Sequence, residues 1–205
     1  MNQKRVKALK QLKALSEKPK EMRLAAEGWK EEWQILVSTI MSARTRDEVT
    51  IPTAHKLFAK YPSIEKLAKV KTKDVERLIR PVNFYRNKSK SVVGAAKKIA
   101  EDFNGKVPHK ISDLLTIPGV GSKTANVFLS EVGKDAIGVD THVHYISRYL
   151  GWSKEKDPKK VGKDLEKLFP KSYWSKINQT LVRFGKSHTS RKEKNMLLDK
   201  IKKIK

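Results

Sequence analysis

The sequence has 205 residues with 46 Lys plus Arg against 22 Asp plus Glu, a formal charge of +24. This excess of positive charge attracts phosphates at long range and predicts a nucleic-acid partner whose affinity depends strongly on salt. No apolar run approaches the ~20 residues of a membrane span, the N-terminus lacks the apolar core of a signal peptide, and cysteine is absent, which excludes disulfides and thiolate-held metals.

Helical periodicity dominates the sequence, and no alternating strand pair is convincing. Apolar residues step by three and four around residues 33–41, 75–79 and 92–99. Proline and glycine interrupt the pattern at Pro52, Pro62, Pro81, 105–108, 118–121, 133–138, Pro158 and Pro170. We therefore predict an all-α fold of roughly ten short helices.

Residues 114–129, LLTIPGVGSKTANVFL, combine a Gly-x-Gly turn with a lysine at the start of a new helix. Pro118 ends the preceding helix, and Gly119 and Gly121 allow backbone conformations that other residues avoid. We expect Ser122 to cap the next helix, whose first turn presents unpaired N–H groups and a partial positive charge suited to a phosphate. The alternative interpretation is an ordinary tight turn between two helices.

This stretch resembles the second half of the helix-hairpin-helix motif in the endonuclease III family of DNA glycosylases, which reads L-P-G-V-G-x-K-T-A. Lys123 falls on the catalytic lysine of that family. Residues 139–143, VDTHV, resemble the family's V-D-T-H segment, whose aspartate is the partner of the lysine and is Asp140 here. Two motifs in this order are far more specific than one, and the resemblance runs from about residue 33 to 186.

The resemblance implies a bifunctional DNA glycosylase and apurinic/apyrimidinic lyase that removes oxidised pyrimidines. Lys123 would hold the opened sugar as a Schiff base, and β-elimination would nick the strand. A helix from residue 122 to about 132 advances ~16 Å, and the loop 133–139 can stretch to at most ~25 Å, so Asp140 can return to face Lys123. The simpler interpretation of Asp140 is a helix N-cap, which is compatible with catalysis.

Two further segments resemble loops with which the family fills the gap left by an extruded nucleotide. Residues 42–47, SARTRD, resemble S-A-Q-x-x-D, and residues 83–88, NFYRNK, resemble G-[LF]-Y-x-x-K. Phe84 would be the apolar wedge, and Arg44 stands where the family usually has glutamine, so the preference for the opposite base would differ. The expected DNA-binding residues are Ser42, Arg44, Asp47, Phe84, Gly119, Val120, Gly121 and Ser122. The alternatives are core packing for Phe84 and a phosphate contact from a surface helix for Arg44.

The family usually closes with four cysteines that hold a [4Fe–4S] cluster. Aligned on residues 185–186, their positions become Thr189, Met196, Asp199 and Lys205, which cannot form a ligand set. We therefore expect no iron–sulfur cluster and no other required cofactor, although family analogy allows a monovalent cation on the backbone carbonyls of residues 118–121. Apolar side chains would hold the C-terminal part instead, with Leu181, Met196, Leu197, Leu198 and Ile201 as candidates.

In the family, two helical domains flank a DNA-binding cleft. By resemblance, residues 28–134 would form a six-helix barrel domain containing the helix-hairpin-helix. Residues 1–27 and 135–205 would form a second helical domain from both termini, without an iron–sulfur cluster. Residues 1–23 and 186–205 each carry eight Lys or Arg against two acidic residues, so they would form one positive wall along the DNA or, alternatively, two solvated tails.

Two other functions compete with this interpretation. An adenine or mismatch glycosylase of the same superfamily would generally lack the lysine. A non-catalytic helix-hairpin-helix DNA-binding protein would need no carboxylate, so Lys123 and Asp140 together favour the bifunctional enzyme. We expect a monomer that acts on damaged double-stranded DNA, without a membrane, inside the cell in the cytoplasm and associated with the nucleoid.

Overall fold

The computed structural model describes residues 2–18 and 22–205, and every regular element in these ranges is a helix. The predicted all-α fold is therefore confirmed. The chain divides into two compact units: a central unit, Arg23–Val132, and a terminal unit, Met1–Met22 with Gly133–Lys205. The sequence-based boundaries were 27/28 and 134/135. Within the described ranges, no helix is both long and apolar enough to cross a membrane.

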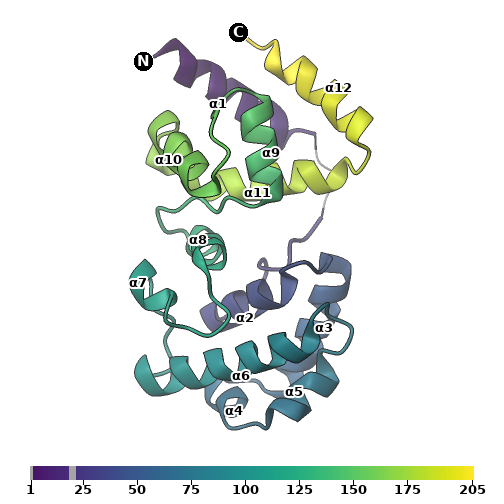
Figure 1. The fold of residues 1–205 in the computed structure, drawn as a ribbon, viewed down its shortest axis with the longest axis vertical. Helices are drawn as coiled ribbons and strands as arrows, with labels where there is room; N and C mark the ends of the chain where they lie inside the picture. The colour runs from purple at the N-terminus through teal and green to yellow at the C-terminus, as the bar shows by residue number, and fades with distance from the viewer. Residues whose placement is uncertain (1, 19–21) are drawn as a thin grey trace. The chain divides into compact units, whose positions relative to one another are not determined.

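The central unit is built around its longest helix. α6 (Tyr85–Asp102) packs against three other helices, and α2 packs against both α3 and α8. Leu36, Val37, Val92, Ala96 and Ile99 are buried in its core, as the apolar periodicity predicted. The other helices of this unit are α2 (Glu32–Ser42), α3 (Asp47–Lys60), α4 (Ile64–Ala68), α5 (Thr72–Leu78), α7 (Ile111–Leu114) and α8 (Ser122–Glu131), as Figure 1 shows.

Pro52 does not interrupt a helix as the sequence suggested, because it lies inside α3. A proline at this position removes one backbone hydrogen bond, toward the carbonyl of Glu48. The buried face of the helix continues past it through Thr53, Ala54 and Leu57. Burial of that face outweighs the lost hydrogen bond, so the expected break at Pro52 was wrong.

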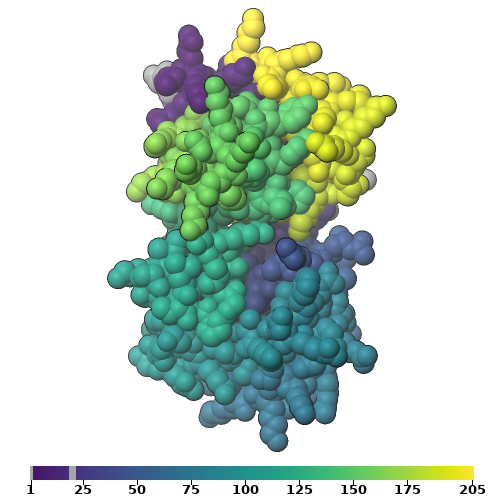
Figure 2. Space-filling model, in the orientation of Figure 1, coloured from purple at the N-terminus to yellow at the C-terminus, as the bar shows by residue number. Residues whose placement is uncertain are grey.

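The terminal unit joins the two ends of the chain. α1 (Gln3–Ser16) packs against α10, α11 and α12, and α11 also packs against α9. The N-terminal and C-terminal segments lie side by side in this unit, purple and yellow in Figure 2. Its other elements are α9 (Thr141–Tyr149), α10 (Pro158–Leu168), the 3-10 helix η1 (Lys171–Tyr173), α11 (Trp174–Ser187) and α12 (Arg191–Lys202).

A buried glutamine connects three parts of the terminal unit. Gln11 on α1 accepts a hydrogen bond from Trp152 Nε1 at 2.7 Å, and its own amide donates to the carbonyl of Ile201 on α12 at 3.3 Å. Trp152 stacks edge to face on Phe169, with ring centroids 4.9 Å apart. The network therefore connects α12 to α1. The buried amide of Gln11 keeps these hydrogen-bond partners because they offset the hydration that it loses on burial.

The apolar residues expected to hold the C-terminal part of the chain divide into two groups. Leu181, Leu198 and Ile201 are buried, whereas Leu197 is half-buried and Met196 is 56% exposed. Met196 lies on the outer face of α12, so its expected packing role was wrong. Leu198 and Ile201, spaced by three, form the apolar stripe that faces the rest of the unit.

Candidate functional site

The Pro-Gly segment between α7 and α8 forms a tight turn. The N–H of Val120 donates to the carbonyl of Ile117 at 3.0 Å, with Pro118 and Gly119 at the two central positions. Gly119 has a φ of 81°, a left-handed value that glycine adopts without steric cost. Proline followed by such a glycine is the pattern of a type II turn.

This turn is anchored on α6. A Cβ placed on Gly119 would lie 2.6 Å from the Cβ of Ser91, and a Cβ on Gly94 would lie 3.0 Å from the Cβ of Pro118. Both glycines therefore permit close approach between the turn and the helix. Gly121 is different, because a Cβ there would meet nothing within 4 Å and its φ is −95°. The fold requires glycine at position 119 but not at position 121.

The helix that follows begins without a side-chain cap. Gly121 is the N-cap residue of α8 and makes no side-chain hydrogen bond, while Ser122 is already the first helical residue. The expectation that Ser122 caps the helix was therefore wrong. Lys123 is the second helical residue and is exposed. The first turn thus leaves backbone donors for an external anion, with a lysine beside them.

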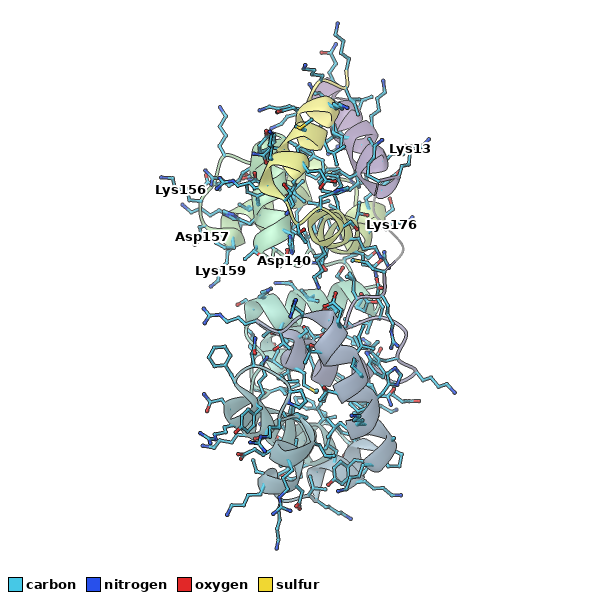
Figure 3. All side chains as sticks on the ribbon, turned by 90° about the vertical axis from the view of Figure 1, so that its right-hand side faces the viewer. Lys13, Asp140, Lys156, Asp157, Lys159 and Lys176 are labelled. Carbon is cyan, nitrogen blue, oxygen red and sulfur yellow. The ribbon has the colours of Figure 1, made fainter. Side chains whose placement is uncertain are left out.

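Asp140 is the N-cap of α9, labelled in Figure 3. Its Oδ1 accepts hydrogen bonds from the N–H groups of His142 at 2.9 Å and Val143 at 2.8 Å. The capping interpretation is therefore confirmed. Both hydrogen bonds use Oδ1, and the residue is half-buried. The second carboxylate oxygen, Oδ2, takes no part in the cap.

Two contacts with α11 fix the segment around Asp140. The buried amide of Asn178 donates to the carbonyl of Gly138 at 2.8 Å. The ring of His142 lies so close to α11 that a Cβ on Gly185 would come within 2.2 Å of His142 Nδ1. Sequence reasoning used the glycine only to align the C-terminus and missed Asn178. An asparagine among the apolar positions of an amphipathic helix was the available signal.

The structure brings Arg44 and Phe84 together in the central unit. Both have left-handed backbones, with φ of 55° and 59°, and the guanidinium carbon of Arg44 lies 5.9 Å from the centroid of the Phe84 ring. Phe84 is 58% exposed, so the core-packing alternative is wrong. Arg44 lies in the loop between α2 and α3, so its expected place on a surface helix was wrong, and a contact with a phosphate stays an untested alternative.

The neighbouring residues hold the two loops. Ser42, the last residue of α2, donates from Oγ to the carbonyl of Thr39 at 3.0 Å, and Asp47 is buried in the first turn of α3. Asn83 donates from its amide to the carbonyl of Arg44 at 2.6 Å, and its backbone N–H donates to Thr45 Oγ1 at 3.2 Å. Sequence reasoning named Ser42 and Asp47 but gave no role to Asn83.

The C-terminal positions that correspond to the cluster cysteines do not fit an iron–sulfur cluster. Asp199 accepts a hydrogen bond from the hydroxyl of Tyr149 at 2.8 Å, and the carbonyl of Lys205 accepts one from Lys10 at 3.1 Å. Thr189 and Met196 are exposed. Throughout residues 2–18 and 22–205, no three His, Cys, Asp or Glu side chains gather in a way that could hold a metal ion.

Lys123 belongs to the central unit and Asp140 to the terminal unit. The approach of the Lys123 amine to the Asp140 carboxylate therefore stays a prediction. Each unit contains part of the candidate site. The central unit supplies an uncapped helix start with an exposed amine and a pair of strained loops, and the terminal unit supplies a half-buried carboxylate at a helix start.

Comparisons with known proteins agree with this geometry. Residues 37–171 match the HhH-GPD superfamily of base excision DNA repair proteins. The chain is 43% identical to endonuclease III of Thermotoga maritima over 75% of this chain and 73% of the relative, and 40% identical to endonuclease III of Synechocystis over 75% and 71%. A solved structure of a trapped endonuclease III–DNA covalent intermediate superposes with a TM-score of 0.81 at 29% identity, covering 93% of this chain and 89% of that chain.

The chain therefore belongs to the HhH-GPD superfamily of base excision DNA repair proteins and, within it, to the endonuclease III family. It is a DNA glycosylase with lyase activity at abasic sites. A thermostable thymine-DNA glycosylase has a similar fold, with a TM-score of 0.80 at 23% identity. The matches to endonuclease III favour neither the adenine or mismatch glycosylase nor the non-catalytic binding protein.

Proposed function

We propose that this enzyme removes oxidised pyrimidines from double-stranded DNA and then cleaves the strand through a Schiff base on Lys123. One observation carries the proposal: Lys123 is exposed in the first turn of a helix that has no side-chain cap. The preceding turn is held against α6 at Gly119. A DNA phosphate bound to the open N–H groups of residues 121 and 122 would place the sugar beside the amine.

The reaction assigns a separate task to each residue. The Nζ of Lys123 bonds to C1′ of the deoxyribose while the bond from C1′ to the damaged base breaks. The carboxylate of Asp140 stabilises the positive charge on the sugar and accepts a proton from the amine. After the ring opens, the sugar is a Schiff base on Lys123. Loss of a proton from C2′ then expels the phosphate on the 3′ side, which is the β-elimination.

The hydrogen bonds of the Asp140 carboxylate support this assignment, because the helix cap uses only one of its two oxygens. Oδ1 is committed to the N–H groups of His142 and Val143, which holds the side chain in one orientation. Asn178 binds the backbone carbonyl of Gly138 before this cap, and the ring of His142 after it lies against Gly185. The charge of the carboxylate therefore occupies a defined position and requires little reorganisation when positive charge develops nearby.

Recognition of the lesion is assigned to the two loops of the central unit. The exposed ring of Phe84 would occupy the space of the extruded nucleotide, and Arg44 beside it would contact the opposite base. Ser42 is the last residue of α2 and Asp47 the first of α3, so they lie on either side of the loop that carries Arg44. Gly119, Val120, Gly121 and Ser122 would bind the strand backbone.

The chemistry uses an amine and a carboxylate, so neither proposed step is routed through a metal or cluster. A monovalent cation on the carbonyls of residues 118–121 remains part of the proposal, with a role in holding the same phosphate. The enzyme would act as a monomer on damaged DNA at the nucleoid, in the cytoplasm. The charge of +24 supports attraction to DNA phosphates.

Borohydride trapping tests this function. Added during reaction with a duplex that contains an abasic site, borohydride reduces the Schiff base to a stable protein–DNA adduct. Lys123→Gln should abolish the adduct and retain binding to DNA. Lys97→Gln is the matched control, because Lys97 is an exposed lysine on α6, and it should form adduct at the wild-type rate. Adduct formation by Lys123→Gln at that rate would remove Lys123 from its role.

A further inference from the structure

Lys88 is a lysine buried in the central unit, with only 8% of it exposed. It lies in the first turn of α6, and its Nζ donates to the carbonyl of Met41 at 2.6 Å, to the carbonyl of Ala43 at 2.5 Å and to Thr45 Oγ1 at 3.0 Å. An ammonium group has three N–H donors. All of them are therefore used on one short segment, residues 41–45.

That segment carries Arg44, and Lys88 lies four residues after Phe84. Ala43 and Thr45, two of the three residues that Lys88 binds, flank Arg44 directly. Asn83 adds a hydrogen bond to the carbonyl of Arg44 and another to Thr45 Oγ1. Five hydrogen bonds thus connect residues 41–45 with residues 83–88.

Each of the two connected segments contains one residue with a strained backbone. Arg44 and Phe84 have positive φ, and only one other non-glycine residue of the described chain, Asn104, shares this feature. Such conformations persist only where the surrounding structure enforces them. The hydrogen bonds of Lys88 and Asn83 are local contacts that can enforce them.

We propose that Lys88 is a positioning residue that holds Arg44 and Phe84 side by side as one preformed unit for entry into the DNA stack. This inference rests on the proposed recognition role of those two residues. An intercalating pair that is already ordered in the free enzyme loses less conformational freedom on binding. Lys88 itself would not touch the DNA, because its three donors point into the protein.

Burying the charge of Lys88 in the central unit is unfavourable unless its hydrogen bonds compensate for the lost hydration. Burial lowers the pKa of the Lys88 ammonium to about 8, because removal from water disfavours the charged form. An apolar side chain of similar volume could fill the same space without that cost. It could not bind two backbone carbonyls and a hydroxyl at once, however, and so it could not fix the loop around Arg44.

The test is a double-mutant cycle between Lys88→Met and Phe84→Ala, with Lys97→Met as the exposed-lysine control. Single-turnover excision and binding would be measured on lesion-containing and undamaged duplexes. In the wild-type background, Lys88→Met should slow excision by on the order of tenfold, the scale of a lost aromatic–base contact, with little effect on undamaged DNA. In the Phe84→Ala background the same change should have little further effect. The proposal would be overturned if Lys88→Met slowed excision equally in the wild-type and Phe84→Ala backgrounds, or weakened binding equally to lesion-containing and undamaged duplexes.

Hydrogen exchange gives an independent readout of the same idea. In Lys88→Met, amides of residues 42–46 and 83–87 should exchange faster, while those of α4 should not change. If Phe84→Ala alone leaves the rate of excision unchanged, Phe84 does not act as the wedge. The hydrogen-exchange rates of Lys88→Met then still decide whether Lys88 holds the two loops. Unchanged exchange would overturn the positioning role.

A milder variant covers the case in which Lys88→Met does not fold. Thr45→Val removes one acceptor of Lys88 and one of Asn83 but keeps Lys88 and its two backbone carbonyl partners. It should reproduce the faster exchange and the slower excision to a smaller extent, and Thr45→Ser, which keeps the hydroxyl, should restore both. A Thr45→Val variant that behaves like wild type in both measurements would overturn the proposal.

Discussion

Asp140 combines a structural task and a proposed chemical task in one side chain. Its Oδ1 caps α9 through two backbone N–H groups, and in the proposed reaction the charge of the group would stabilise the sugar. The two tasks can be separated because an asparagine keeps the accepting oxygen and loses the charge. The residue therefore allows a clean comparison between stability and activity.

We predict that Asp140→Asn changes the free energy of unfolding by less than about 0.5 kcal/mol and slows base excision by about 100-fold or more. Asp140→Ala should slow excision as well and should also destabilise the protein by about 1 kcal/mol, because the cap is lost. Chemical denaturation and single-turnover excision measure the two effects. Wild-type excision by Asp140→Asn would leave only the capping role.

At the scale of residues, two short motifs named Lys123 and Asp140. The helix cap at Asp140 is confirmed, and the catalytic roles of both residues stay predictions. The positive φ of Arg44 and Phe84 could not be predicted, because neither residue type favours it. Lys88 could have been noticed: it lies four residues before Val92, on the stripe of α6 that is buried, where a lysine is unusual.

At the scale of elements, the hairpin between α7 and α8 depends on one glycine more than on the other. Gly119 has a positive φ and lies against Ser91, whereas Gly121 has an ordinary φ and open space around it. Both glycines belong to the same motif, so a sequence pattern alone gives them equal weight. Their different surroundings predict different costs of substitution.

We predict that Gly119→Ala destabilises the protein by about 2–4 kcal/mol, from the left-handed backbone and the clash with Ser91. Gly121→Ala should cost less than about 1 kcal/mol, the difference between glycine and alanine at an N-cap. Thermal or chemical unfolding of the two variants measures this contrast. Equal costs would show that the turn can move away from α6.

Elements were predicted well where an apolar stripe was long or a motif marked the first residue. α2, α6, α8 and α9 were found in this way. Pro52 was taken as a break because proline removes a hydrogen bond, but the packing of α3 compensates for that loss. Short helices such as α4 and α7 have too few residues for a periodic signal.

At the scale of the whole molecule, the terminal unit depends on pairing between segments that are far apart in the sequence. Gln11 and Ile201 are 190 residues apart and share a buried hydrogen bond. Periodicity could predict neither this pair nor the hydrogen bond from Trp152, because both require knowledge of which helices meet. The proposal that both termini build one domain came from the family resemblance alone.

We predict that α12 is held by its buried stripe and not by its exposed apolar residue. Leu198→Ala should destabilise the protein by about 2–5 kcal/mol, the usual cost of a cavity at a fully buried leucine. Met196→Ala, on the exposed face of the same helix, should change stability by less than about 0.5 kcal/mol. Calorimetric unfolding of both variants is the measurement. Similar losses would mean that α12 packs in another orientation.

The most direct test of the central claim is to find the amino group that bonds to DNA. The borohydride-reduced adduct would be digested with nuclease and trypsin and its peptides sequenced by mass spectrometry. Trypsin does not cut after a modified lysine, so a sugar on Lys123 would appear on a single peptide of residues 111–134. We predict that peptide as the site of the adduct. An adduct on another lysine or on the N-terminal amine, with Lys123 unmodified, would contradict the account.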